Sequence, residues 1–333
     1  MTVSDRRRAG RAVVVGAGHV GMIAAMRLAE ANVFAEVVLV DVAGSRAEGI
    51  ALDLTHTGAL TGSGTAVRGV TTLADAGPAD YVVVTAGKAR TPGMSRTDLV
   101  STNAAIVGSA SDIAAHSPDA MVVVVSNPLD EMTYQLWRVS GFPAHRVVGM
   151  AGLLDSARFR ALASVGGAGD VTGLDALALG SHGAEMVIPL SHAPQVMSAL
   201  PSEDVAAIED RARNSGGEVV GLLGDGSAFF GPGTAAARMV LAMVADSDEV
   251  ISATVRPDGE YGLRDVYVGL PAVLGATGSA RSSRSTSHPT NSGNCVTPPP
   301  ASASGSRSCP ETRSGQGVRA GRPPVARPRR GGR

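Results

Sequence analysis

The chain has 333 residues, 44% hydrophobic and 18% charged, which predicts a globular protein of two domains. No apolar run approaches the ~20 residues of a membrane span, and the charged N-terminus lacks the apolar segment of a secretory signal. Both cysteines, Cys295 and Cys309, lie near the C-terminus, which excludes a disulfide framework or a thiolate metal site in the folded part. We therefore expect a cytoplasmic protein with no membrane partner and no metal.

The net charge of −1 conceals two unlike segments. Residues 279–333 carry ten arginines and one acid, Glu311, and thus about +9, whereas residues 1–278 hold the other 19 basic and 29 acidic residues, or −10. The last segment is rich in Arg, Ser and Pro and poor in large aliphatic residues. It cannot bury enough apolar area to offset ~1–2 kcal/mol of backbone entropy per residue, so we expect a disordered tail over 279–333.

Between residues 11 and 150, strand-like and helix-like runs alternate. Strands are expected at 11–18, 36–41, 81–87 and 121–128, and helices at 19–31, 44–58 and 98–116. The strands are continuous valine runs, which indicates that both of their faces are covered. Repeated strand–helix units predict a doubly wound parallel α/β sheet of the Rossmann type over 10–149.

The first of these strands ends in a glycine-rich turn that opens a helix. Gly16, Gly18 and Gly21 form a GxGxxG pattern, in which the glycines permit a tight turn, a close approach to a pyrophosphate and close helix–strand packing. Asp41 ends the next strand, where a carboxylate can bind a ribose 2′-hydroxyl and repel a 2′-phosphate. The pattern predicts NAD rather than NADP, although an Asp can also simply end a strand.

Polar residues follow the next two strands. Arg90 and Arg96 lie in the Pro/Gly-bearing stretch KARTPGMSR after the strand at 81–87, where ligands bind in such sheets. A guanidinium can hold a carboxylate through two hydrogen bonds, so two arginines suggest a substrate with more than one polar or anionic group. Asn127 follows the strand at 121–128 and could hold a substrate hydroxyl or the nicotinamide. The alternatives are solvated loop charges and an Asn-Pro turn.

From residue 150 to 278 the pattern predicts a mixed α+β domain. Helices are expected at 153–164, 203–213, 217–223 and 227–245, and strands at 174–182, 186–191, 249–256 and 264–275. Asp155 and Arg158 are three apart on a predicted helix and therefore share a face. His182 stands beside Gly183 at the end of a predicted strand. A surface ion pair and a structural histidine are the alternative interpretations.

Taken together, these side chains suit hydride transfer between a nicotinamide and a secondary alcohol. His182 could exchange the hydroxyl proton, because the pKa of histidine lies near neutrality. Asp155 could orient that ring and stabilise its charged form. Arg158 could hold a substrate carboxylate in two hydrogen bonds, and a second arginine could polarise the carbonyl.

The chain resembles the lactate/malate dehydrogenase family over residues 11–278, through GAGHVG, Asp41, RTPGMSRTDL, SNPLD, LDSARFR and GSHGAEM in family order. The resemblance implies that Arg96 polarises the carbonyl, that Arg158 binds the C1 carboxylate, and that His182 with Asp155 forms the proton relay. It also implies that Asn103 and Asn127 contact the cofactor.

By the same resemblance, Arg90 selects the substrate. Arginine there implies a second carboxylate, hence the dicarboxylates malate and oxaloacetate, whereas lactate-specific members usually carry glutamine. Ala228 also fits malate. The family forms homodimers or homotetramers. A lactate dehydrogenase is the alternative within this class.

The sequence departs from the family at two places. Ala184 replaces a residue that is usually acidic or polar, for which Glu185 could compensate. From about Ser279 the family's amphipathic C-terminal helix is replaced by Arg/Ser/Pro sequence, which we interpret as a possible frameshift. Two alternatives follow: a catalytically impaired NAD-binding chain, and nonspecific nucleic-acid binding through the tail, which its lack of aromatic residues makes the weaker hypothesis.

Overall fold

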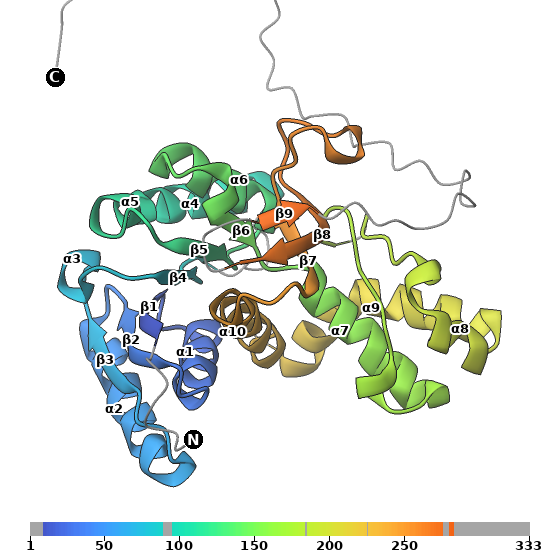
Figure 1. Ribbon diagram of the computed structural model, residues 1–333, viewed down its shortest axis with the longest axis horizontal. Coiled ribbons are helices and arrows are strands. Elements are labelled where there is room, and N and C mark those ends of the chain that lie inside the picture. The colour runs from blue at the N-terminus through green and yellow to red at the C-terminus, as the bar shows by residue number, and fades with distance from the viewer. Residues whose placement is uncertain (1–8, 89–94, 184, 225, 276–279, 283–333) are drawn as a thin grey trace, which may run out of the picture. The chain divides into compact units, whose positions relative to one another are not determined.

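The computed structural model describes residues 9–88, 95–183, 185–224, 226–275 and 280–282 (Figure 1). In this part of the chain the strands form one nine-stranded sheet, in the order β3-β2-β1-β4-β5-β6-β7-β8-β9. The strands are β1 (Ala9–Val15), β2 (Phe34–Val40), β3 (Ala66–Val70), β4 (Tyr81–Val84), β5 (Met121–Val124), β6 (Val147–Gly149), β7 (Val250–Val255), β8 (Val268–Leu274) and β9 (Ala280–Ser282). The helices are α1 (His19–Glu30), α2 (Gly44–Thr61), α3 (Leu73–Ala76), α4 (Arg96–Ser109), α5 (Ile113–His116), α6 (Leu129–Ser140), α7 (Gly152–Ala163), α8 (Pro194–Ala199), α9 (Ser202–Leu223) and α10 (Phe230–Ala245).

Strands β1 to β6 are all parallel and carry helices on both faces, which confirms the predicted doubly wound α/β fold. Val14 belongs to the same core as Leu28 of α1 and Met239 of α10. The neighbouring Val13 belongs to a second core with Leu136 of α6. Because successive residues of a strand point to opposite faces, a strand covered on both sides must be apolar at every position, which explains the valine runs.

The sheet order reverses between β1 and β4, so the turns that follow these two strands meet at one edge. Gly16 directly follows β1 with a φ of +104°, and an added Cβ would lie 2.8 Å from the backbone nitrogen of Ala86, beyond β4. The Thr85 hydroxyl donates hydrogen bonds to the carbonyls of Val15 and Gly16. Crevices at such reversals are the ligand sites of doubly wound sheets.

The second half of the chain extends this sheet with antiparallel strands. β6 pairs with β7 through Gly149 and Thr254, and β7, β8 and β9 form an antiparallel edge. β9 lies inside the segment that the sequence predicts to be a disordered tail from residue 279 on. A strand can form there because its backbone pairs with the edge of β8, which needs no apolar side chains. The other tail residues, from 283 on, lie outside the described residues. The domain boundary expected near residue 150 stays a prediction.

Other expectations for the second half are wrong in part. The strands predicted at 174–182 and 186–191 are absent from the described residues there, where only the isolated bridges Leu179–Val187 and Gly180–Gly269 occur. The apolar side chains of these segments instead join a third core with α7, α8 and α9. The break predicted between the helices at 203–213 and 217–223 is also wrong, since α9 continues through Gly216 and Gly217 and packs against α7. The helix predicted over 98–116 is interrupted after Ser109 by a 3-10 turn.

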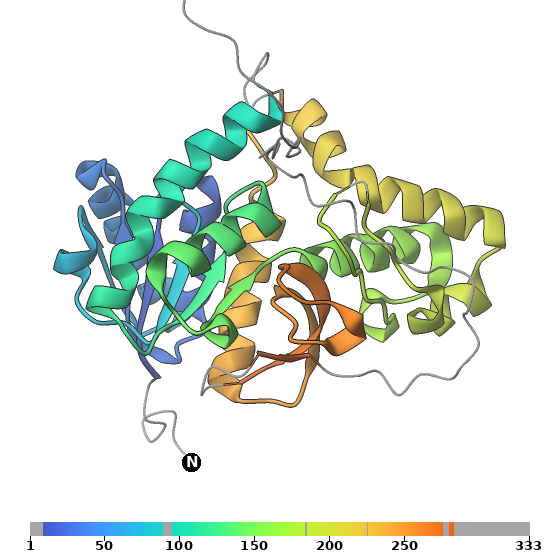
Figure 2. The ribbon, with the colours of Figure 1, turned by 90° about the horizontal axis from the view of Figure 1, so that it is seen from above.

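Helix α10 returns from the second half to cover the first. Figure 1 shows it beside α1, Figure 2 shows it near the middle of the ribbon, and α1 and α10 are in extensive contact. Gly233 of α10 allows this approach, because an added Cβ would lie 2.7 Å from the carbonyl oxygen of Val20 and from Ile23. Among the described residues, no helix is both long and apolar enough to cross a membrane.

Candidate active site

Three predicted residues form one connected cluster. Asp155 and Arg158 lie one turn apart on α7, and the Asp155 side chain is only 4% exposed. His182 Nδ1 lies 2.8 Å from Asp155 Oδ2, and Arg158 Nη1 donates to Asp155 Oδ1 at 3.0 Å. The ion pair is present, but it is largely buried rather than the surface pair of the alternative interpretation, and the same carboxylate also holds the histidine ring. A buried carboxylate bonded to Nδ1 fixes the ring orientation and directs Nε2 toward a substrate.

The surroundings of His182 favour its charged form. Burial of the ring lowers the pKa of His182, but the hydrogen bond and charge of Asp155 outweigh that effect. Arg158 also lowers the pKa of the ring, and Asp130 raises it. The net result is a raised pKa, as is useful for a group that gives a proton to a carbonyl near neutral pH.

Asp130, which the sequence alone did not single out, anchors the backbone of the histidine loop, residues 180–183. It lies in the first turn of α6, three residues after Asn127 in the same SNPLD motif. Asp130 Oδ2 accepts hydrogen bonds from the hydroxyl of Ser181 at 2.9 Å and from the backbone N–H of His182 at 3.2 Å. Its Oδ1 accepts from the hydroxyl of Thr254 on β7 at 3.0 Å. The position of an acid in SNPLD was the one signal available in the sequence.

A cavity of about 220 Å³ opens beside this cluster. Its lining includes Asn127 at the end of β5, Arg158, His182 and Ala228, together with Val20 of α1. Four residues predicted from separate motifs therefore share one cavity. Val20 lies in the helix that the glycine-rich turn opens, so the cavity extends toward the predicted cofactor site.

The glycine-rich turn has the space and the close packing that its three glycines predict. An added Cβ at Gly21 would lie 1.8 Å from the carbonyl oxygen of Gly16, so only glycine allows α1 to pack this closely. At Gly18, by contrast, an added Cβ would meet no protein atom within 4 Å. The chain thus leaves open space beside the N-terminus of α1, where backbone N–H groups and the helix dipole favour an anion.

The other two predicted cofactor residues have well-defined positions. Asp41 follows β2, and its carboxylate accepts from the backbone N–H groups of Ala17 at 2.7 Å and Ala43 at 2.9 Å. These bonds hold the carboxylate against the glycine-rich turn. Asn103, on α4, is buried. Its amide oxygen accepts from the backbone N–H of Lys88, and its amide nitrogen donates to the backbone carbonyls of Lys88 and Asn127. Its amide therefore ties together the loops that follow β4 and β5.

Three of the predicted residues cannot be placed in the cluster. Arg90 and Ala184 lie outside the described residues, and so does the side chain of Arg96, whose backbone begins α4. Glu185, which could compensate for Ala184, is exposed. The roles expected for the two arginines therefore stay predictions.

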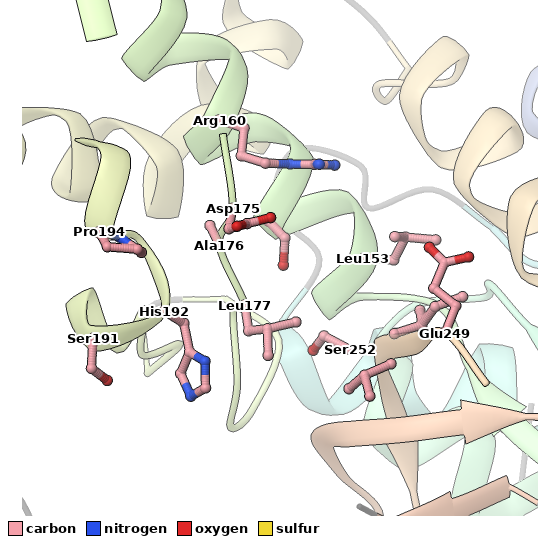
Figure 3. Close-up of a pocket in the computed structure, with 13 residues that line it drawn as sticks. Leu153, Arg160, Asp175, Ala176, Leu177, Ser191, His192, Pro194, Glu249 and Ser252 are labelled. Atoms are coloured by element: carbon pink, nitrogen blue, oxygen red, sulfur yellow. The ribbon is translucent and has the colours of Figure 1, made fainter. Parts of the chain in front are cut away.

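A larger cavity, of about 510 Å³, lies elsewhere on α7 (Figure 3). Its lining includes Arg160, Asp175, His192, Glu249 and Ser252. None of the predicted site residues that the structure describes lines it. Size alone would favour this cavity, but the hydrogen-bonded groups of His182, Asp155 and Arg158 lie at the smaller one. We therefore take the smaller cavity as the candidate active site.

Comparison with known proteins agrees with this geometry. Residues 11–149 match the NAD-binding domain of lactate/malate dehydrogenases, and residues 153–287 match the α/β C-terminal domain of the same family. A malate dehydrogenase of Bacillus cereus is 42% identical over 272 residues, which cover 80% of this chain and 87% of that protein.

Solved structures include both branches of the family. The malate dehydrogenase of Salinibacter ruber is 36% identical with a TM-score of 0.76, over 82% of this chain and 90% of that one. A lactate dehydrogenase of Cryptosporidium parvum, solved with lactic acid and nicotinamide adenine dinucleotide, is 31% identical with a TM-score of 0.76, over 82% and 89%. The glycine-rich turn, the connected cluster and these matches agree, and the chain belongs to the lactate/malate dehydrogenase family of NAD-dependent oxidoreductases.

Proposed function

We propose that this chain is a malate dehydrogenase, which oxidises (S)-malate to oxaloacetate with NAD and catalyses the reverse reduction. The observation that carries the proposal is the cluster of His182, Asp155 and Arg158 at the cavity beside the glycine-rich turn. The cluster combines a proton carrier, its orienting carboxylate and a guanidinium, the three groups that oxidation of a 2-hydroxy acid requires.

The residues present fit NAD. The pyrophosphate would lie in the open space at Gly18, against the N-terminus of α1. Asp41 would bind the adenosine ribose and would repel a 2′-phosphate. Asn127 lines the cavity and would contact the nicotinamide end or the substrate hydroxyl. Bound NAD supplies the hydride acceptor, and the chain's own side chains supply the binding and the proton transfer.

His182 would carry the proton. Its Nδ1 is bonded to Asp155, which leaves Nε2 as the nitrogen that accepts the hydroxyl proton of malate. The charge of Asp155 stabilises the imidazolium that forms, and the raised pKa of His182 agrees with this role. In the reverse direction the same nitrogen returns the proton to the carbonyl oxygen of oxaloacetate.

Arg158 would bind the C1 carboxylate. Its guanidinium lines the cavity and is held at one nitrogen by Asp155, which orients it. Arg96 would polarise the carbonyl, and Arg90 would bind the second carboxylate of a dicarboxylate substrate. The names of the curated relatives support malate, and the small side chain of Ala228 in the cavity leaves room for the second carboxylate.

The test is NADH oxidation at 340 nm by the full-length chain, with oxaloacetate and with pyruvate. We expect a kcat/KM ratio of oxaloacetate to pyruvate well above one. Arg90→Gln should shift that ratio toward pyruvate while the NADH affinity stays at its parent value. A parent ratio below one would contradict malate and favour the second candidate, a lactate dehydrogenase, which the similarity to the Cryptosporidium parvum enzyme supports.

The altered C-terminal segment leads to a third candidate, a chain that binds NAD without turning over. Thermal unfolding with and without NADH distinguishes it, because ligand binding stabilises a folded protein in proportion to the logarithm of the ligand concentration over Kd. Stabilisation by NADH without turnover of either substrate would favour this candidate. We also propose that the chain is cytoplasmic and forms a homodimer or homotetramer. Sedimentation of the purified chain would test the oligomeric state.

A further inference from the structure

We propose that Asp130 is a positioning residue for His182, whose carboxylate fixes the backbone of the histidine loop to α6 and β7. The inference rests on the proposed function, in which His182 carries the proton. Asp155 holds the ring of His182, whereas Asp130 holds its main chain, so the proton carrier is attached at two points by two carboxylates.

The histidine loop needs such an anchor. His182 is flanked by Gly183 with a φ of +122°, and Gly180 has a φ of +87°. Glycine allows these conformations but also loses the most conformational freedom when it is ordered. The bridge from Gly180 to Gly269 fixes the start of the loop, and Asp130 fixes the two residues that follow.

The hydrogen-bonding pattern of Asp130 suits a carboxylate. The groups that donate to it are the hydroxyls of Ser181 and Thr254 and the backbone N–H of His182. An ionised carboxylate accepts at both oxygens, whereas an amide accepts at one atom only and would have to donate to a hydroxyl at the other, which reverses that hydrogen bond. These neutral donors do not fully offset burial, which raises the pKa of Asp130 despite the three hydrogen bonds. The chain thus buries an acid whose ionised form is disfavoured by burial, in contact with the backbone of His182.

The charge of Asp130 also acts on the ring. Among the described residues, the charged or titratable groups that act on His182 are Asp155, Arg158 and Asp130. Arg158 disfavours the imidazolium, and the two carboxylates favour it. Replacing Asp130 with a neutral residue should therefore shift the titration of His182 to lower pH, besides loosening the loop.

The experiment compares Asp130→Asn and Asp130→Ala in the full-length chain. Asp170→Asn is the matched control, because the exposed Asp170 accepts from a hydroxyl and a backbone N–H of Thr172 in the same manner, away from the cavity. The His182 ring is titrated by proton NMR and assigned by its loss in His182→Gln. Oxaloacetate kinetics, the NADH Kd by fluorescence and the thermal midpoint are measured on the same samples.

We expect Asp130→Asn to lower the titration midpoint of His182 and to reduce kcat about tenfold. Asp130→Ala should reduce kcat by about 100-fold, as for a catalytic group displaced by ~1 Å. The NADH Kd should stay within about twofold, and Asp170→Asn should match the parent. A fall in the thermal midpoint alone, with kcat and the His182 titration unchanged in both variants, would overturn the proposal. A parent chain without turnover would contradict the proposed function, and the NMR titration would still decide the role of Asp130.

Discussion

Replacement of Gly21 by alanine should damage both the fold and NADH binding. The new Cβ would lie 1.8 Å from the carbonyl oxygen of Gly16 and 2.9 Å from the hydroxyl oxygen of Thr85. Since an acceptable carbon–oxygen contact is roughly 3.3 Å, α1 would have to move by roughly 1.5 Å. Overpacking of this kind costs about 1–3 kcal/mol, or a fall of about 2–12 °C in the thermal midpoint.

The same movement displaces the N–H groups that would face the pyrophosphate. Loss of one hydrogen bond to a charged group costs about 1.5–3 kcal/mol, so the NADH Kd should rise about 10- to 150-fold. Fluorescence titration with NADH measures the affinity, and thermal unfolding without ligand measures the stability.

Gly18→Ala is the matched control within the same turn. Gly18 has a φ of −73°, which alanine adopts without strain, and its added Cβ would meet no protein atom. The thermal midpoint of this variant should stay close to the parent value, while NADH binds more weakly because the methyl group enters the space for the pyrophosphate. Equal loss of stability in Gly18→Ala and Gly21→Ala, or undiminished NADH affinity in both, would refute the reasoning.

Three further changes test other parts of the molecule. Asp155→Asn should lower the pKa of His182 and reduce kcat by about 100- to 10,000-fold, measured as the pH profile of oxaloacetate reduction; an unshifted profile would argue against the relay. In the parent, the interactions that raise the pKa of His182 should stabilise the fold fully below the unfolded value of about 6.5, and this contribution should be lost as pH rises through the folded pKa. An Asp155→Asn variant whose stability has the same pH dependence in this range would contradict the coupling between Asp155 and His182. Phe159→Ala removes a fully buried ring from the core of α7 and should cost about 3–5 kcal/mol in urea unfolding, and a cost under about 1 kcal/mol would mean that this core repacks. Burial raises the pKa of Glu36, but Arg68 and Arg11 outweigh burial and lower that pKa. The stabilisation by Glu36 should therefore be present above the unfolded value of about 4.3 and be lost as pH falls through the folded pKa. Glu36→Gln should remove this loss of stability in acid, and a variant that still loses it would show that other groups cause it.

The elements of the first half that could be predicted have local signals, whereas β3, β6 and α6 were not predicted. The valine runs and the glycine spacing of Gly16, Gly18 and Gly21 each lie within a few residues, and the structure has the strands, the turn and the helix where they predict them. Asp155 and Arg158 were predictable as a pair because helical spacing alone puts them on one face. Their meeting with His182 was inferred from the needs of hydride transfer and from the family resemblance, because no local pattern joins residues 27 positions apart.

The parts that were missed depend on contacts between distant segments. Asp130 is 51 residues from Ser181 and 124 residues from Thr254, and no short window contains that arrangement. The apolar runs at 174–182 and 186–191 fit a strand pattern, but their buried residues fill the core beneath α7 and α9. Short apolar runs do not say which neighbour will cover them.

The crossing of α10 onto α1 determines which pieces of this enzyme could be exchanged with a relative. Helix α10 covers the face of α1 at Val20 and Ile23, and its buried residues belong to the same core as β1. A cofactor-binding fragment that ended at residue 149 would leave this face without its partner helix. The module suited to recombination is therefore discontinuous in sequence, and a chimera should carry α10 together with the glycine-rich turn, taking both from one parent.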